Sequence, residues 1–256
     1  MTESLEQAAE GHLASQRLAF QAVETIAGLM QEGWTEKQTA ALLNTYLRDH
    51  GVSGFFHEAF VWFGDRTRFE GVGSYGQYSP SNRHLLSDDI FILDVAPIYH
   101  GYVSDIGYTR CLAGSEPLDA ALEALQELRK WIPSLFNVSG AVVGEDIWKQ
   151  VDERIRRQGY ENIHQLYPFS VLGHRVHSVP EGLSAFKWWN FGWQSYWSLL
   201  SRGLLSQLLS PTSKGELKGL WAVEPHLGGK GFGAKFEEIL IVDEDGARWL
   251  EGERRV

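Results

Sequence analysis

The 256-residue sequence contains a single cysteine, Cys111, so the chain can form neither an internal disulfide nor a thiolate metal cluster. A lone cysteine fits a reducing cytoplasm, where we expect the protein to be. No stretch approaches the roughly 18 uninterrupted apolar residues of a membrane-spanning helix. The acidic, polar start MTESLEQAAEGHLASQ is also unlike a targeting segment. We therefore expect no membrane partner.

Positive charge is also scarce. The chain has 23 basic and 33 acidic residues, a net charge of −10, which repels phosphate backbones and anionic lipid. The most basic segment, Arg154 to Arg157, follows Glu153 and is interrupted by Ile155, which is typical of a solvated helix face. We therefore expect no nucleic-acid partner.

The sequence has no low-complexity linker, and we expect one domain over residues 1–256 without a separate N-terminal domain. Apolar spacing predicts helices at 4–31 and 36–49, then strands at 55–63, 90–97 and 102–112. The same order follows again, with helices at 117–131 and 145–157 and strands at 168–172, 220–226 and 235–243. This repeated layout indicates a duplicated unit.

Two predicted hairpins each carry a pair of carboxylates. Asp94 and Asp105 are symmetric about a turn at 99–101, and Glu224 and Glu237 are symmetric about the glycine-rich turn at 228–231. Residues that face each other across an antiparallel turn point to the same side of the sheet. For the aspartates the alternative is a polar pair satisfied by Arg110 or by backbone amides. For the glutamates it is a solvent-facing strand, to which we assign Glu238.

Four carboxylates on inner faces repel one another strongly, and protons or metal ions are needed to hold them together. The segment SVLGHRVHSVPEG adds His174 and His177 as further candidate ligands. Oxygen-rich sites with one imidazole suit Mn²⁺, Fe²⁺, Co²⁺ or Zn²⁺. We therefore predict two divalent metal ions, which together can activate a hydroxide nucleophile at neutral pH.

The ordered set Asp94, Asp105, His174, Glu224 and Glu237 resembles the metal ligands of the pita-bread metallopeptidases, the family of methionine aminopeptidases, aminopeptidase P, prolidase and creatinase. The segments ILDVAPIYHGYVSDIGYTR, LGHRVH, AVEPHL and KFEEILIV are similar to the motifs of that family. The resemblance runs from about residue 10 to residue 245. It implies an α+β pita-bread fold, with pseudo-twofold duplicated helix-helix-strands units and a curved antiparallel sheet.

The resemblance also implies roles for individual residues. Asp105 and Glu237 would bridge the two metal ions, Asp94 would hold one of them, and His174 and Glu224 would complete the other. Glu224 would assist proton transfer, and His177 would act in catalysis and touch the substrate. The chain departs from the family in that only two residues separate His174 from His177, and that residues 71–83 contain no histidine.

Besides His177, the candidate substrate contacts are Tyr78 and His226. Tyr78, like Gln77, lies in the segment 71–83 where the family has its histidine, and His226 shares a strand face with Glu224. The segment FKWWNFGWQSYW, with Trp188 and Trp189, is extra material for which we favour a site-capping role. A dimer contact, plain core packing and an interfacial membrane helix are its alternatives, so a homodimer stays open.

We therefore expect a metal-dependent hydrolase that cleaves an amide-type C–N bond in a small molecule or short peptide. A metal-dependent lyase on the same fold is the alternative, and a non-catalytic binding module is the third hypothesis.

Overall fold

The structure is a computed structural model, and it describes residues 4–72, 74–136, 142–179, 187–188, 191–192, 201–251, 254 and 256. The first half begins with α1 (Leu5–Leu29) and α2 (Glu36–Asp49), as the apolar spacing predicts. Both helices start at a capping box, in which Ser4 and Thr35 accept hydrogen bonds from the backbone N–H groups of Gln7 and Gln38.

The first sheet contains β1 (Gly54–Phe63), β2 (Ile90–Tyr99), β3 (Tyr102–Val103), β4 (Ile106–Cys111), β7 (Lys187–Trp188) and β8 (Phe191–Gly192). Its order is β3-β2-β1-β8-β7, and β4 pairs with β2. The strands pair antiparallel, and the long β1–β2 ladder forms the centre of this sheet. Helices α1 and α2 cover one face of it through a core that includes Val23, Leu43, Phe63 and Phe91.

The second half repeats this plan with α3 (Glu116–Phe136) and α4 (Gly144–Arg157). A five-stranded sheet has the order β14 (Gly246–Trp249), β13 (Glu238–Asp243), β10 (Gly219–Val223), β6 (Gly173–Arg175), β9 (Leu208–Leu209). A smaller sheet has the order β12 (Phe232–Lys235), β11 (His226–Gly229), β5 (Glu161–Asn162). Leu125, Val151, Trp221 and Leu240 belong to the core beneath α3 and α4.

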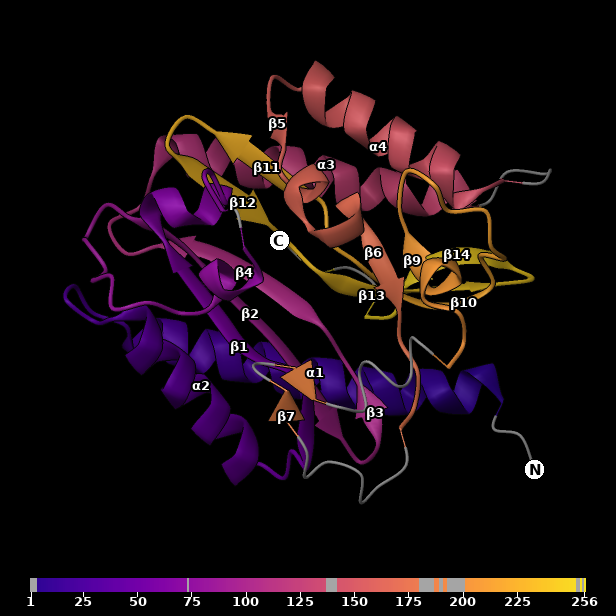
Figure 1. The fold of residues 1–256 in the computed structure, drawn as a ribbon, viewed down its shortest axis with the longest axis horizontal. Helices are drawn as coiled ribbons and strands as arrows, with labels where there is room; N and C mark the ends of the chain where they lie inside the picture. The colour runs from indigo at the N-terminus through magenta and orange to yellow at the C-terminus, as the bar shows by residue number, and fades with distance from the viewer. Residues whose placement is uncertain are drawn as a thin grey trace.

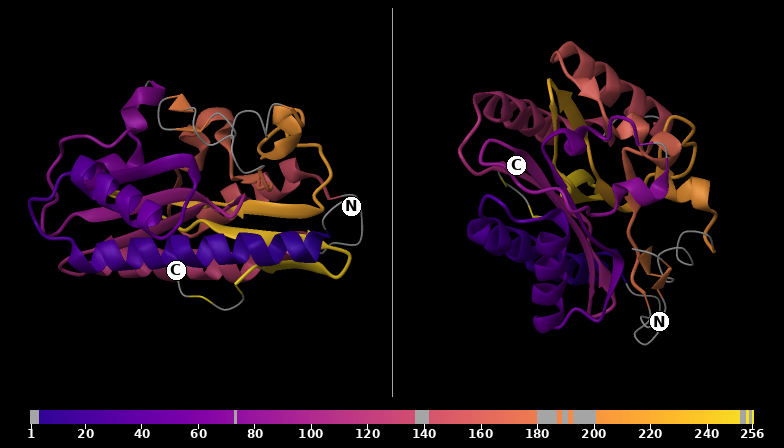
Figure 2. Two further views of the ribbon diagram at one scale, coloured as in Figure 1. Left: turned by 90° about the horizontal axis from the view of Figure 1, so that it is seen from below. Right: turned by 60° about the vertical axis from the view of Figure 1, so that its left-hand side comes forward.

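Short 3-10 helices connect these elements: η1 (Gly64–Arg68), η2 (Tyr75–Tyr78), η3 (His164–Leu166), η4 (Pro168–Ser170) and η5 (Leu204–Gln207). In Figure 1 the pair α1/α2 lies in the lower part of the view and the pair α3/α4 in the upper part. Figure 2 shows α1 running along one face of the strands, with short helices and connecting segments on the opposite face. The open face of the sheets is therefore available for a site that both halves build.

The register of the two hairpins was predicted with mixed success. In the second hairpin Val223 pairs with Glu238 and His226 pairs with Lys235, so Glu224 and Glu237 hold facing positions as expected. In the first hairpin Asp94 pairs with Gly107, so the expectation that Asp105 lies directly opposite Asp94 is wrong by two residues. Because side chains alternate with period two, a shift of two leaves Asp105 on the predicted face.

Three of the four acidic residues lie at interruptions between strands. Asp105 falls between β3 and β4, Glu224 between β10 and β11, and Glu237 between β12 and β13. The continuous strands predicted at 102–112, 220–226 and 235–243 are therefore divided at the candidate ligands. The strand predicted at 168–172 is wrong, because η4 occupies 168–170, with positive φ at Phe169, and β6 begins only at Gly173.

Candidate metal centre

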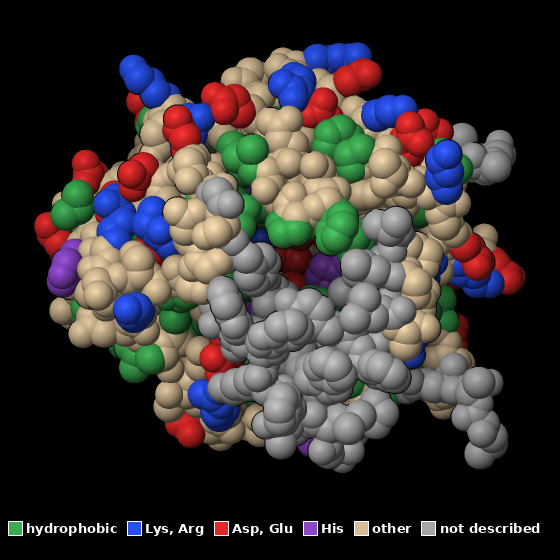
Figure 3. Space-filling view, viewed as in Figure 1, with side chains coloured by type: hydrophobic (Ala, Val, Ile, Leu, Met, Phe, Trp, Pro, Cys, Tyr) green, Lys and Arg blue, Asp and Glu red, His purple; other side chains and the backbone are tan. Residues whose placement is uncertain are grey.

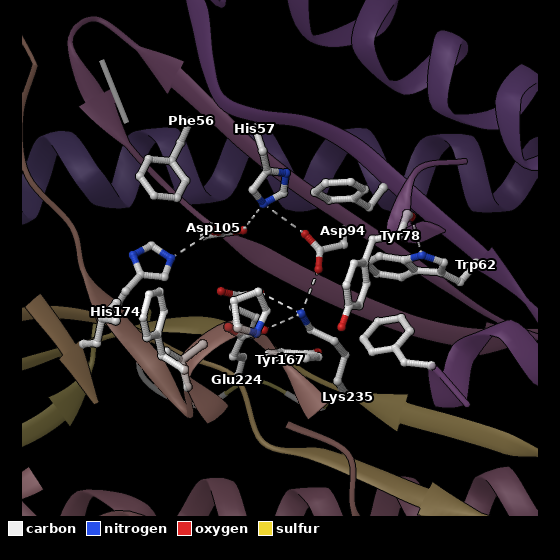
Figure 4. Close-up of a pocket in the computed structure, with 17 residues that line it drawn as sticks. Phe56, His57, Trp62, Tyr78, Asp94, Asp105, Tyr167, His174, Glu224 and Lys235 are labelled. Atoms are coloured by element: carbon white, nitrogen blue, oxygen red, sulfur yellow. Dashed lines mark hydrogen bonds and ion pairs between the residues drawn. The ribbon is translucent and has the colours of Figure 1, made fainter. Parts of the chain in front are cut away.

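The five candidate ligands meet at the floor of one cavity of about 350 Å³, which both halves of the chain line. Each is almost fully buried, with exposed fractions of 5% for Asp94, 3% for Asp105, 7% for His174, 7% for Glu224 and 2% for Glu237. Figure 4 shows Asp94, Asp105, His174 and Glu224 converging from β2, β6 and the strand interruptions. In the space-filling view, acidic and histidine side chains lie at the bottom of a hollow (Figure 3). The Arg110 alternative fails, because the Arg110 guanidinium lies over the Tyr108 ring and donates to the Thr109 carbonyl.

A second histidine, His57 of β1, belongs to the same centre and was missed in the sequence. Its Nε2 lies 3.1 Å from Asp105 Oδ1 and 3.3 Å from Asp94 Oδ1. His174 Nε2 lies 3.1 Å from the other oxygen of the same aspartate, Asp105 Oδ2. Each ring donates its Nδ1–H to the backbone carbonyl of the following residue, Glu58 or Arg175. These carbonyl contacts orient Nε2 toward the carboxylates, as outer-shell partners do for metal-binding histidines.

A lysine also occupies the centre, and sequence reasoning did not single it out. Lys235 Nζ lies 2.7 Å from Asp94 Oδ2, 2.8 Å from Glu224 Oε2 and 2.9 Å from Glu237 Oε2. Its side chain is 1% exposed. Lys235 lies two residues before Glu237, so the period-two argument that singled out His226 beside Glu224 would have found it.

The charges in the centre shift the acidities of its members. Burial lowers the pKa of His57, but the Asp105 and Asp94 carboxylates outweigh it and raise that pKa to about 9. Burial likewise opposes the charge of Lys235, yet its three carboxylate neighbours hold the pKa of the ammonium well above its ordinary value. Burial, with repulsion from neighbouring carboxylates, raises the pKa of Glu224 and of Glu237. Lys235 and His57 are therefore the groups whose positive charge the carboxylates of the centre stabilise.

The donor set fits a divalent transition metal. Asp105, His174 and Glu237 each offer one ligand atom within 4.8 Å of the others, and His57, Asp94 and Asp105 form a second such group. Asp94 Oδ1 is buried and accepts no hydrogen bond from the described residues. Imidazole nitrogens combined with carboxylate oxygens suit Zn²⁺, Mn²⁺, Fe²⁺ or Co²⁺.

The walls of the cavity are mostly aromatic: Phe56, Phe60, Trp62, Phe69, Tyr78, Tyr167 and Phe169 line it. The Phe56 ring stacks on His174 with the ring centres 4.9 Å apart. Trp62 Nε1 donates a 2.7 Å hydrogen bond to the Tyr78 carbonyl, which joins β1 to the end of η2. The polar floor therefore lies beneath an apolar chamber.

Of the remaining predicted site residues, only Tyr78 is among the described residues that line the cavity. Tyr78 lines the cavity, and its hydroxyl donates to the Leu166 carbonyl. His177 follows β6, bonds the Gln207 side chain and is not among the described residues that line the cavity. His226 is fully buried, with Nδ1 2.8 Å from the Tyr167 hydroxyl. Trp188 forms part of β7, of which only the backbone is described, and Trp189 lies outside the described residues.

Glu238 is not the surface residue that the strand pattern indicated. Glu238 is 1% exposed as a residue, and its carboxylate accepts two 2.7 Å hydrogen bonds from Arg129 of α3. The strand β13 is thus covered on the face that was assigned to solvent. This ion pair joins α3 to β13, and the Arg129 guanidinium also lies over the Trp249 ring, 5.3 Å from the ring centre.

The sequence model of one family, described as metallopeptidase family M24, matches residues 10–244 of the chain. The chain belongs to this family. The predicted family resemblance is thereby confirmed. M24 membership implies a divalent metal cofactor, in agreement with the donor set at the floor of the cavity.

Solved structures of M24 type share the fold. An X-Pro aminopeptidase from Thermotoga maritima matches with a TM-score of 0.73 and 19% identity, over 100% of this chain and 64% of that one. A prolidase from Pyrococcus furiosus matches with a TM-score of 0.70 and 19% identity, over 96% of this chain and 64% of that one. These matches confirm the predicted pita-bread fold.

A curated relative named as an uncharacterized peptidase of Staphylococcus aureus is 27% identical over 127 residues, which is 45% of this chain and 34% of the relative. The chain therefore spans only part of the length of the relatives that it matches. Among the described residues, no helix is both long and apolar enough to cross a membrane.

Proposed function

We propose that the chain is a metal-dependent hydrolase that cleaves an amide-type C–N bond in a short peptide or small molecule. The observation that carries this proposal is the convergence of four carboxylates and two imidazoles on the floor of one cavity. Membership of a metallopeptidase family supports the same reaction class. When bound, a divalent metal supplies activation of water and polarisation of a carbonyl group.

The protein's own residues have distinct roles in this reaction. Asp94, Asp105, His174, Glu224 and Glu237 are the proposed metal ligands, and His57 joins them because its Nε2 faces Asp94 and Asp105. Glu224 is the proposed proton carrier, since it lines the cavity and burial raises its pKa above the ordinary value. Neither His177 nor His226 is among the described residues that line the cavity. Their proposed contacts with substrate therefore require a substrate that extends beyond this lining.

The lining of the cavity favours a substrate with an apolar or aromatic side chain. Rings from β1, η1–η2 and η3–η4 line the space above the carboxylates. A substrate that fills this apolar space would displace water, which would strengthen the electrostatic interactions between a scissile amide and the floor. The names of the fold neighbours, X-Pro aminopeptidase and prolidase, make short peptides with an apolar residue beside proline the first substrates to assay.

Two groups of donor atoms, which share Asp105, support the expectation of two ions. We propose Mn²⁺, Fe²⁺, Co²⁺ or Zn²⁺ as occupants, and the cytoplasm as the compartment where the enzyme works. One domain for residues 1–256 is the proposed organisation, and a homodimer stays an open alternative. The number of ions that the centre accepts depends on the positive charge of Lys235, which already lies among the carboxylates.

The test combines metal binding with product analysis. Chelator-treated protein should take up a transition metal and gain activity on apolar dipeptides, whereas Asp105→Ala should lose metal uptake while its circular dichroism stays native. Asp245→Ala, in an exposed turn, is the matched control and should behave as wild type. Hydrolysis in H₂¹⁸O places one ¹⁸O in the product, and an unlabelled product would indicate elimination by a lyase. A chelator-insensitive, metal-free protein would favour a binding module.

A further inference from the structure

Lys235 contacts the acidic residues of both halves at once. Asp94 belongs to β2 of the first half, whereas Glu224 and Glu237 flank the β11–β12 hairpin of the second. An ammonium group has three hydrogens to donate, and here it meets three carboxylate oxygens at 2.7–2.9 Å. Its donor capacity is therefore used in full within the centre (Figure 4).

The protein makes room for this side chain. Lys235 is 2% exposed as a residue, and its aliphatic part passes beside Gly107, where a Cβ would lie 2.6 Å from Lys235 Cε. The ammonium also faces the Tyr167 ring, 5.6 Å from the ring centre. A lysine is almost never fully buried unless it is paired. The burial of Lys235 and its three ion pairs thus make it an integral part of the centre.

The charge balance changes when this ammonium is counted. Four carboxylates carry four negative charges, which two divalent ions would match one for one. With Lys235 present, the same two ions would exceed the charge of the four buried carboxylates by one. Two of the carboxylates that Lys235 holds, Asp94 and Glu237, are also needed by the two donor clusters, one in each.

We propose that Lys235 takes the place of one of the two metal ions, so that the centre binds a single divalent cation. This inference rests on the metal-dependent function proposed for the same site. Asp105 is the carboxylate that Lys235 does not contact, and its two oxygens face His57 and His174 instead. The single ion binds at Asp105, and the lysine provides a second, permanent positive charge beside it.

Metal stoichiometry tests this inference without reference to activity. Chelator-treated protein is titrated with Mn²⁺ by calorimetry, and bound metal is counted by mass spectrometry after desalting. Wild type should bind one equivalent, and Lys235→Met, which keeps the length but removes the charge, should bind two. Lys218→Met removes an exposed lysine that pairs with Glu244, and should bind one equivalent like wild type.

Each outcome separates this inference from the proposed function. Two equivalents in wild type, or one equivalent in a natively folded Lys235→Met, would overturn the role of Lys235 and leave metal dependence standing. If neither protein bound metal, the proposed function itself would fail. Should Lys235→Met not fold, electron paramagnetic resonance of Mn²⁺-saturated wild type still decides. An isolated six-line signal supports one ion, and an exchange-coupled pair signal contradicts it.

Discussion

Gly107 lies directly behind Lys235, and a methyl group on Gly107 would stand 2.6 Å from Lys235 Cε. Because the lysine is buried and held at its tip by three carboxylates, it cannot swing away without breaking those contacts. Gly107→Ala should therefore lower the free energy of unfolding by about 1–3 kcal/mol, as overpacking does in other closed interiors.

The same steric conflict predicts coupling between the two positions. In a Lys235→Ala background the Gly107→Ala change should cost clearly less, since the atoms that it meets are gone. Urea denaturation of the wild type, both single variants and the double variant measures the coupling. Additivity of the two changes to within about 0.5 kcal/mol would refute the packing explanation.

The buried pair between Arg129 and Glu238 predicts a large stability effect. Both side chains are almost fully enclosed, with exposed fractions of 4% and 2%. Arg129→Met would leave a buried carboxylate without its partner, at a cost of about 3–5 kcal/mol. The midpoint of chemical denaturation reports it. Lys149→Met, which breaks an exposed pair with Glu145, is the control and should leave the midpoint unchanged.

Stability should fall at mildly acidic pH because of His164. This residue is fully buried beside Asn162, and burial lowers its pKa to about 3, from about 6.5 in an unfolded chain. Between these values only the unfolded chain binds the proton, so stability decreases as the pH falls below about 6.5. From pH 7.5 to pH 5 the loss from this residue is about 2 kcal/mol. His164→Gln should show a correspondingly smaller loss, and equal losses in both proteins would contradict the assignment.

His57 is expected to strengthen metal binding, since its Nε2 faces two of the proposed ligands. His57→Ala should weaken the apparent affinity for Mn²⁺ or Zn²⁺ by about ten- to a hundredfold, as loss of a supporting group does at other metal sites. Calorimetry against His50→Ala provides the comparison, because His50 is exposed and stacks on Tyr46 away from the centre. An unchanged affinity in His57→Ala would remove it from the site.

The aromatic chamber predicts substrate selectivity. Phe60 lines the cavity between His57 and Trp62, and the Phe60 and Trp62 rings stack with centres 5.4 Å apart. Phe60→Ala should lower kcat/KM for dipeptides with an aromatic side chain by about 10–200-fold. Dipeptides with small side chains should change much less. An equal loss for both substrates would indicate a general structural role for Phe60.

The symmetry of the predicted hairpins identified the four carboxylates of the centre but not the basic residues His57 and Lys235 beside them. The symmetry argument works at Glu224 and Glu237 because the ladders on either side of them share one register. His57 escaped it because β1 has register irregularities on both sides of this residue, between Phe55 and His57 and between His57 and Phe60. Such irregularities break the alternation of faces, so the side of the sheet on which His57 lies cannot be read from residue numbers.

Two other errors have local causes. Glu238 was assigned to solvent because one face of an antiparallel strand is often wet, whereas here Arg129 of α3 covers it. The run at 168–172 is apolar enough for a strand, but Pro168 opens a 3-10 helix and Phe169 has a φ of 60°. Helix boundaries fared better because capping residues mark them, as Thr35 does for α2.

The Lys235 contacts also bear on how the two halves of the molecule stay together. A metal ion can be chelated or lost by dilution, whereas an ammonium tethered to β12 cannot diffuse away from Asp94 on β2. The apoprotein therefore keeps an ionic contact between its two halves. When transition metals are scarce, the two halves should stay joined, and the cavity should be able to bind metal again.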